Sequence, residues 1–158
     1  MDVVAEVEVA CSAAELFAVV EDLGRYPQWL DIVARAEPLS VEGEPAEGAT
    51  AEGGDPAPAW AVDLRGRLGP LARSKRLRMV RSELVAPRRV VFERAEVDGR
   101  QHSSWRLSAE VTERAGKGAD LRMHLHYGGT LFGPVLERVL RDEIERSKDR
   151  LRALVAAG

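Results

Sequence analysis

The chain has 158 residues, which suits one domain of ordinary size, covering residues 1–158, and leaves no room for two. Hydrophobic residues make up 45% of it and charged residues 31%, a composition typical of a soluble globular protein. Its formal net charge of −3 argues against a general nucleic-acid-binding protein, which normally carries a basic surplus. The single cysteine, Cys11, excludes an intrachain disulfide and gives no sign of an oxidising compartment.

No targeting segment is recognisable at the start of the sequence. The first residues lack a basic region followed by an apolar one, so we expect no signal peptide. No run approaches the roughly 18 apolar residues of a membrane span, so we expect no transmembrane segment. These observations favour a cytoplasmic protein.

The first part of the chain reads as a strand followed by a helix. Residues 3–10 alternate apolar and polar side chains, the period of a half-buried strand. Ser12 and Glu15 have the spacing of a capping box, which predicts a helix start. Gly24 is expected to end that helix.

A short second helix and a second strand are predicted next. Pro27 suits the first turn of a helix, and Tyr26 and Trp29 are expected to pack on the sheet or on the first helix. Residues 32–41 read as a strand. Residues 42–58 are rich in Gly, Pro, Ala and Glu, which predicts a mobile loop.

The middle of the chain consists of alternating segments separated by turn residues. Short turns between successive strands predict an antiparallel meander. The predicted strands cover residues 60–68, 73–81, 89–97, 102–112 and 120–127.

The chain ends in a long amphipathic helix, predicted over about residues 131–156, with apolar side chains at helical spacing and a charged opposite face. A meander of this size has an apolar face that must be covered, and this helix is the only predicted element long enough to do so. The sequence therefore predicts an α+β fold, in which a curved antiparallel sheet of about seven strands wraps around the last helix and two short helices accompany it.

Five segments carry a resemblance to a known family. They are SAAELFAVVEDL at 12–23, YPQW at 26–29, ELVAPRRVVFE at 83–93, GGTLFGPVLERVL at 128–140 and RSKDRLRAL at 146–154. In this order they resemble the START/SRPBCC superfamily, whose fold is called helix-grip, and especially its bacterial polyketide cyclase/dehydrase-like and lipid-transport-like members. The resemblance implies a cavity between the sheet and the last helix that takes an apolar or amphipathic ligand.

Strand parity and helical spacing indicate which side chains face that cavity. We expect ligand contacts from the strand residues Trp60, Val62, Leu64, Leu77, Met79, Phe92, Trp105, Leu107, Met123, Leu125 and Tyr127 and from the helix residues Leu136, Leu140, Ile144 and Ser147.

Two functions fit the resemblance. The first is binding or transport of a small hydrophobic or amphipathic ligand, such as a lipid, a polyketide or an isoprenoid-like molecule. The alternative is a polyketide cyclase/dehydrase-like enzyme acting on an aromatic polyketide precursor, with the Tyr127 hydroxyl as the candidate catalytic group. Whether the chain is an enzyme stays open, and we expect no cofactor.

Two further features concern metals and partners. His124 and His126 share one strand face, opposite the apolar one, and no cysteine or carboxylate completes a convincing metal site, so we predict none. The stretch from Arg65 to Arg81 is rich in arginine and is either a solvated face or a surface for an anionic partner. The sequence leaves both a monomer and a homodimer open.

Overall fold

The structure is a computed structural model that describes residues 1–39, 57–65, 75–129 and 133–157. Within these residues, seven strands form one antiparallel sheet in the order β1-β7-β6-β5-β4-β3-β2. The strands are β1 (Asp2–Val9), β2 (Val33–Pro38), β3 (Ala59–Leu64), β4 (Lys75–Val85), β5 (Arg89–Arg94), β6 (Trp105–Glu113) and β7 (Ala119–Tyr127). The helices are α1 (Ala13–Val20), the 3-10 helix η1 (Leu23–Gln28) and α2 (Gly133–Ala157).

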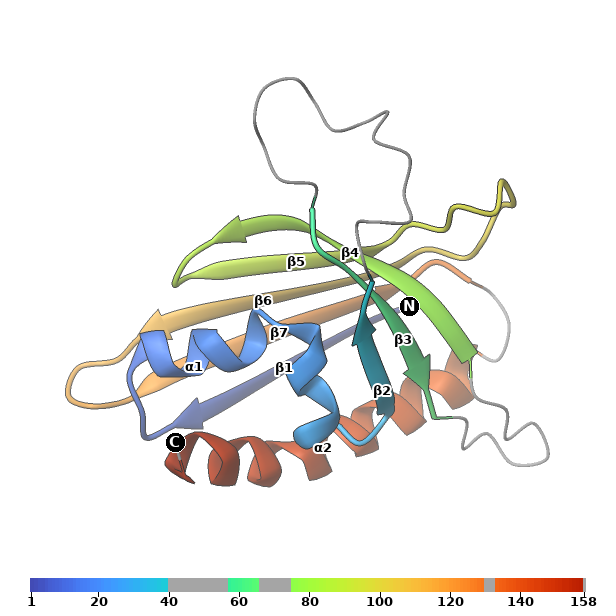
Figure 1. The fold of residues 1–158 in the computed structure, drawn as a ribbon. Coiled ribbons are helices and arrows are strands. Elements are labelled where there is room, and N and C mark those ends of the chain that lie inside the picture. Colours follow the sequence, from blue (N-terminus) through green and yellow to red (C-terminus); the bar gives the residue numbers. More distant parts are fainter. Residues whose placement is uncertain (40–56, 66–74, 130–132, 158) are drawn as a thin grey trace, which may run out of the picture.

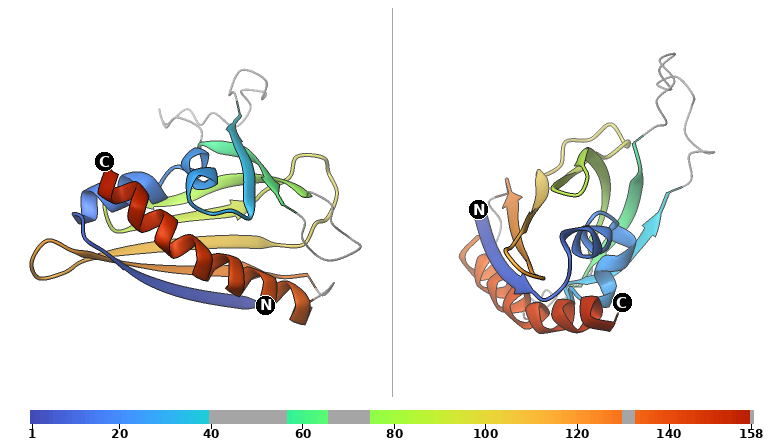
Figure 2. Two further views of the ribbon diagram at one scale, coloured as in Figure 1. Left: turned by 90° about the horizontal axis from the view of Figure 1, so that it is seen from below. Right: turned by 90° about the vertical axis from the view of Figure 1, so that its left-hand side faces the viewer.

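The sheet curls around the long helix, as the sequence predicts. Figure 1 shows the strands arching beside α2, and Figure 2 shows α2 running along the open side of the curled sheet. The predicted fold class, a helix-grip arrangement of about seven strands with two short helices, is confirmed.

The capping box is formed, but the predicted first helix is shorter than expected. The Glu15 backbone N–H donates to the Ser12 hydroxyl at 3.1 Å. Helix α1 then ends at Val20 instead of at Gly24, because the Asp22 carboxylate accepts from the Gly24 N–H at 2.8 Å and caps η1. After this break, η1 places the ring of Tyr26 against Phe92 of the sheet, with ring centroids 6.1 Å apart.

Contacts along α2 hold it against both edges of the sheet. Leu140, Leu151 and Val155 are buried on its inner face. The Arg150 Nη1 atom lies 3.3 Å from an Asp31 carboxylate oxygen on the β2 side, and the Arg152 guanidinium donates to the Glu8 carbonyl of β1. The helix therefore reaches from the edge strand β1 to the turn that precedes β2 and covers the concave face.

Several sequence predictions fall on other parts of the chain. The loop predicted over residues 42–58 lies, except for its last two residues, outside the described residues, as does the middle of the arginine-rich stretch. No helix among the described residues is both long and apolar enough to span a membrane. The cytoplasmic location stays a prediction.

Candidate ligand-binding cavity

A cavity of about 90 Å³ lies between the concave face of the sheet, η1 and α2. Its lining side chains are all apolar or aromatic, and they come from every strand except β5. They are Val3, Ala5, Leu23, Tyr26, Trp29, Leu30, Ile32, Val33, Val62, Leu64, Leu77, Met79, Trp105, Leu107, Met123, Leu125, Leu140 and Ile144. The arrangement offers an apolar molecule a dry environment and offers a charged group no partner.

Antiparallel register gathers these side chains on one face. Val62 of β3 lies opposite Leu77 of β4, and Leu107 of β6 lies opposite Leu125 of β7, which in turn faces Val3 of β1. Residues directly opposite each other in a ladder point to the same side of the sheet. These pairs form an apolar surface on the concave face across β1, β7 and β6 and across β3 and β4.

Many of the side chains predicted to contact a ligand do line this cavity. They are Val62, Leu64, Leu77, Met79, Trp105, Leu107, Met123, Leu125, Leu140 and Ile144. Their contact with a bound molecule stays a prediction.

Trp60 and Phe92 lie on the same face but outside the lining. Their rings pack edge to face with centroids 5.6 Å apart. Tyr26 contacts Phe92 at 6.1 Å and also lines the cavity, so η1 stands between Phe92 and the open space. Both predicted residues therefore fill the core beside the cavity.

Tyr127 and Ser147 also lie outside the lining. The Tyr127 ring packs on Trp105 with centroids 4.5 Å apart, and its hydroxyl lies against the Gly129 backbone, where an added Cβ would overlap it. The Ser147 hydroxyl donates to the Glu143 carbonyl at 2.7 Å within α2. The side chain of Leu136, the last predicted contact, is outside the described part of the chain.

Sequence reasoning missed the contribution of η1 to the cavity. Tyr26 and Trp29 were expected to pack on the sheet or on α1, and both prove to line the cavity as well. The Tyr26 hydroxyl donates to the Val20 carbonyl at 2.9 Å, and burial raises the pKa of this tyrosine well above its usual range. The aromatic and proline pattern around Pro27 was the signal for this wall.

On the convex face, the two strand histidines meet a carboxylate of the neighbouring strand. His124 Nε2 and His126 Nδ1 lie 2.8 and 2.9 Å from the same Asp2 oxygen. The hydrogen bonds from His126 and then His124 lower the pKa of Asp2. These side chains face away from the cavity, as strand parity predicts.

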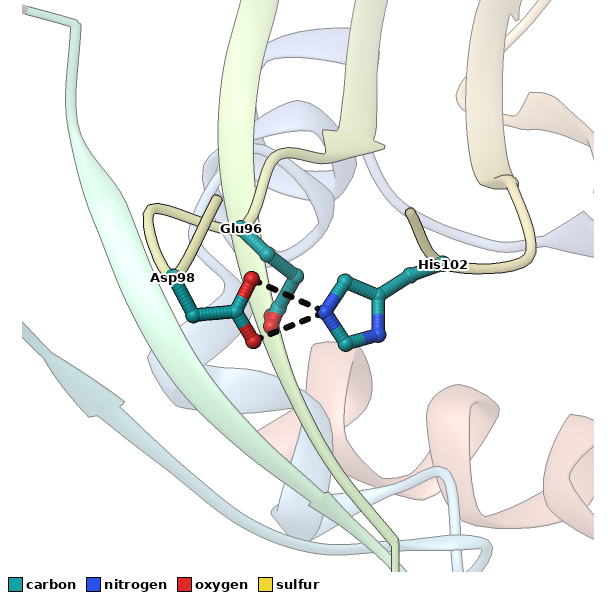
Figure 3. Close-up of side chains that lie close together, drawn as sticks. All are labelled: Glu96, Asp98 and His102. Atoms are coloured by element: carbon teal, nitrogen blue, oxygen red, sulfur yellow. Dashed lines mark hydrogen bonds and ion pairs between the residues drawn. The ribbon is translucent and has the colours of Figure 1, made fainter. Parts of the chain in front are cut away.

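A second polar cluster lies in the connection between β5 and β6 (Figure 3). Ligand-type atoms of Glu96, Asp98 and His102 lie within 4.8 Å of one another. Arg94 Nη2 lies 3.2 Å from His102 Nδ1, and an arginine can only donate, so the ring proton belongs on Nε2, which lies 2.8 Å from Asp98 Oδ2. In the structure His102 is thus paired with Asp98, and Glu96 accepts from the Arg78 backbone N–H at 2.6 Å.

The arginine-rich stretch is also largely paired where it is described. Arg76 binds the Asp63 carboxylate through Nε at 2.8 Å, and this bond lowers the pKa of Asp63. Arg81 Nη1 donates to the Glu21 carbonyl at 3.2 Å. Residues 66–74 lie outside the described part, and an anionic partner at this stretch stays a prediction.

A curled antiparallel sheet closed by a C-terminal helix over an apolar cavity defines the START-like, helix-grip class of proteins. Over residues 1–156 the chain matches the model of the family described as polyketide cyclase / dehydrase and lipid transport, and it belongs to that family. No curated protein sequence gives a significant match.

Solved structures agree on the fold. A START superfamily protein from Mycobacterium smegmatis superposes with a TM-score of 0.71 at 17% identity, covering 99% of this chain and 97% of that one. A conserved protein from Geobacillus kaustophilus superposes with a TM-score of 0.70 at 11% identity, covering 99% of this chain and 96% of that one. The Zhui aromatase/cyclase from Streptomyces superposes with a TM-score of 0.67 at 13% identity, covering 99% of this chain and 93% of that one. At such identities the likeness shows the fold alone.

Proposed function

We propose that this chain binds a small, uncharged hydrophobic ligand in the cavity between the sheet and α2. The observation that supports the proposal is the lining itself, which contains no charged side chain among the residues that the structure describes. Its one hydroxyl, on Tyr26, is already bound to the Val20 carbonyl. An apolar molecule gains free energy by entering such a space, whereas a charged one would lose its hydration without compensation.

The size of the cavity limits what enters without rearrangement. At about 90 Å³ it is smaller than the engineered apolar cavity of about 150 Å³ that holds benzene. A ligand of one ring or more therefore needs the walls to yield. Met79 and Met123 both line the space, and unbranched methionines adapt their shape more readily than other apolar side chains.

An enzymatic function of the polyketide cyclase/dehydrase type is the second candidate, favoured by the family description. Such chemistry needs an acid or base within hydrogen-bond reach of the substrate. The described lining side chains offer only the Tyr26 hydroxyl for this, and Tyr127 lies outside the lining. Turnover of a poly-β-ketone by the parent chain that is lost in the Tyr127→Phe variant would support an enzymatic function. Full activity in that variant would show that the Tyr127 hydroxyl is not the catalytic group.

A pair of neighbouring substitutions tests the binding proposal. Ala5 lines the cavity, whereas Val4 on the same strand is 42% exposed on the opposite face. We expect Ala5→Leu to fill part of the space and to weaken the binding of toluene at least about tenfold, because a filled site excludes the ligand. Val4→Leu should leave the affinity unchanged.

The affinities would be measured by NMR titration of the ¹⁵N-labelled protein. Equal dissociation constants for toluene in the parent chain and in both variants would show that toluene binds outside this cavity. No binding to the parent chain at saturating toluene would also contradict the proposal.

A further inference from the structure

Two buried hydrogen-bond donors in the cavity wall have no acceptor. Trp29 and Trp105 are 4% and 6% exposed, and both line the cavity. The indole Nε1 atom of each is buried and has no hydrogen-bond partner among the described residues. Folded proteins rarely leave such groups unpaired, because a buried donor without an acceptor loses its hydrogen bond to water.

The two indoles reach the cavity from different parts of the fold. Trp29 directly follows η1 and packs on Tyr26 with ring centroids 4.9 Å apart. Trp105 begins β6 and packs on Tyr127. Each ring is held by an aromatic neighbour, so the two donors belong to the built wall of the cavity.

The two indole N–H groups are donors, and the lining side chains offer few acceptors. The Tyr26 hydroxyl donates to the Val20 carbonyl, so only its oxygen can still accept, and the sulfur atoms of Met79 and Met123 are weak acceptors. The described lining contains no carboxylate, imidazole or amide side chain. An alcohol or amine would therefore have only the Tyr26 oxygen or a methionine sulfur as acceptor for its own hydrogen. A carboxylate would bring in a charge with no cation beside it. A neutral ligand that only accepts hydrogen bonds matches the two unpaired indole donors and brings no hydrogen that needs an acceptor of its own.

We propose that the cavity selects an uncharged carbonyl compound, such as a ketone, quinone or ester, whose oxygen accepts a hydrogen bond from the indole N–H group of Trp29, of Trp105 or of both. This inference rests on the proposed ligand-binding function and names the class of ligand. Both nitrogens are covered by neighbouring atoms, so the oxygen reaches them as the walls give way around the ligand.

The test compares two probes of nearly the same shape. Acetophenone carries a carbonyl oxygen where α-methylstyrene carries a methylene group, so the pair differs chiefly in the acceptor. The chain has three tryptophans and therefore three indole N–H signals in a ¹H–¹⁵N spectrum. Trp60 lies outside the cavity lining, so its signal is the internal control.

We expect acetophenone to shift the indole N–H signal of Trp29, of Trp105 or of both downfield, because a new hydrogen bond has this effect. With α-methylstyrene we expect no such downfield shift. We also expect the ratio of ketone to alkene affinity to fall roughly tenfold in the Trp29→Phe/Trp105→Phe double variant, since a hydrogen bond of ordinary net strength is lost. Using a ratio cancels the different hydration of the two probes.

The outcomes separate this inference from the function on which it rests. If both probes bind, neither the Trp29 nor the Trp105 signal shows the ketone-specific shift and the ratio is unchanged, the carbonyl inference is wrong and ligand binding stands. If neither probe binds the parent chain at saturation, both are wrong. The shift is measured on the parent chain, so it decides the question even if the double variant does not fold.

Discussion

Tyr127 shares the concave face with Met123 and Leu125, yet its hydroxyl is turned to the backbone of Gly129. Strand parity gives the face of a side chain but not its distance from a cavity. Trp105 fills the space beside Tyr127 and is itself part of the lining. The ring of the candidate catalytic tyrosine thus packs on a tryptophan of the lining, and a catalytic role for its hydroxyl stays a prediction.

This packing makes a prediction for Gly129. A Cβ at this position would overlap the Tyr127 hydroxyl and ring. We expect Gly129→Ala to lower the free energy of unfolding by about 1–3 kcal/mol, the usual cost of forcing atoms into a packed site. Urea unfolding would measure it. In a Tyr127→Leu background, Gly129→Ala should lower the free energy of unfolding by less. An equal decrease in both backgrounds would show that overlap with Tyr127 is not the cause.

Individual residues also show what the sequence could predict about the site. Leu107 and Leu125 were identified from alternation alone, because a strand places every second side chain on one face. Trp29 could not be assigned to the cavity in this way, since it follows a 3-10 helix whose direction depends on the Asp22 cap. Its unpaired indole N–H appears only when all neighbours are in place.

At the scale of elements, the strands β3 and β4 are joined by a charged pair as well as by their ladder. Arg76 lies directly opposite Asp63 and binds both of its carboxylate oxygens, at 2.8 and 3.3 Å. The Asp63 side chain is 18% exposed and that of Arg76 is 67% exposed. Such a pair, open to solvent on one side, contributes at most about 1 kcal/mol.

The pair predicts a pH dependence with a definite sign. Its hydrogen bonds to Arg76 lower the pKa of folded Asp63 below the unfolded value of about 3.9. The contribution of this ion pair to the free energy of unfolding is therefore complete above pH 4 to 5. It is lost as the pH falls through the pKa of Asp63 in the folded state.

Urea unfolding of the parent chain and of Asp63→Asn at pH 7 and at pH 2 would measure this dependence. We expect the free energy of unfolding of the parent chain to exceed that of Asp63→Asn by at most about 1 kcal/mol at pH 7, and we expect this difference to disappear at pH 2. Arg76→Gln should remove the same pH-dependent part. A difference that persists unchanged at low pH would contradict the assignment to this ion pair.

Predictions for whole elements were better than those for their ends. The strands were found because apolar side chains alternate, and their type and order agree with the structure. The boundary between α1 and η1 was missed, because helical spacing of apolar residues continues from Val20 to Leu23 while the cap at Asp22 breaks the backbone pattern.

At the scale of the whole molecule, a sheet with one apolar face and a single long amphipathic helix leave few ways to bury both. That is why the helix-grip fold could be predicted from the sequence. The volume of the cavity could not, because it is the small difference between the space enclosed and the side chains that fill it. Trp29 and Tyr26, for example, come from outside the sheet and form part of the cavity wall.

A crystal structure with 4-bromoacetophenone tests the central claim most directly, because the anomalous signal of bromine locates the probe without interpretation of its shape. We predict one strong bromine peak between the sheet and α2, within contact distance of side chains such as Leu77 and Leu140 that line the cavity. We also predict the carbonyl oxygen beside the indole nitrogen of Trp29 or Trp105. Bromine found only on the outer surface, with the cavity side chains unmoved at saturating probe, would contradict ligand binding in this cavity.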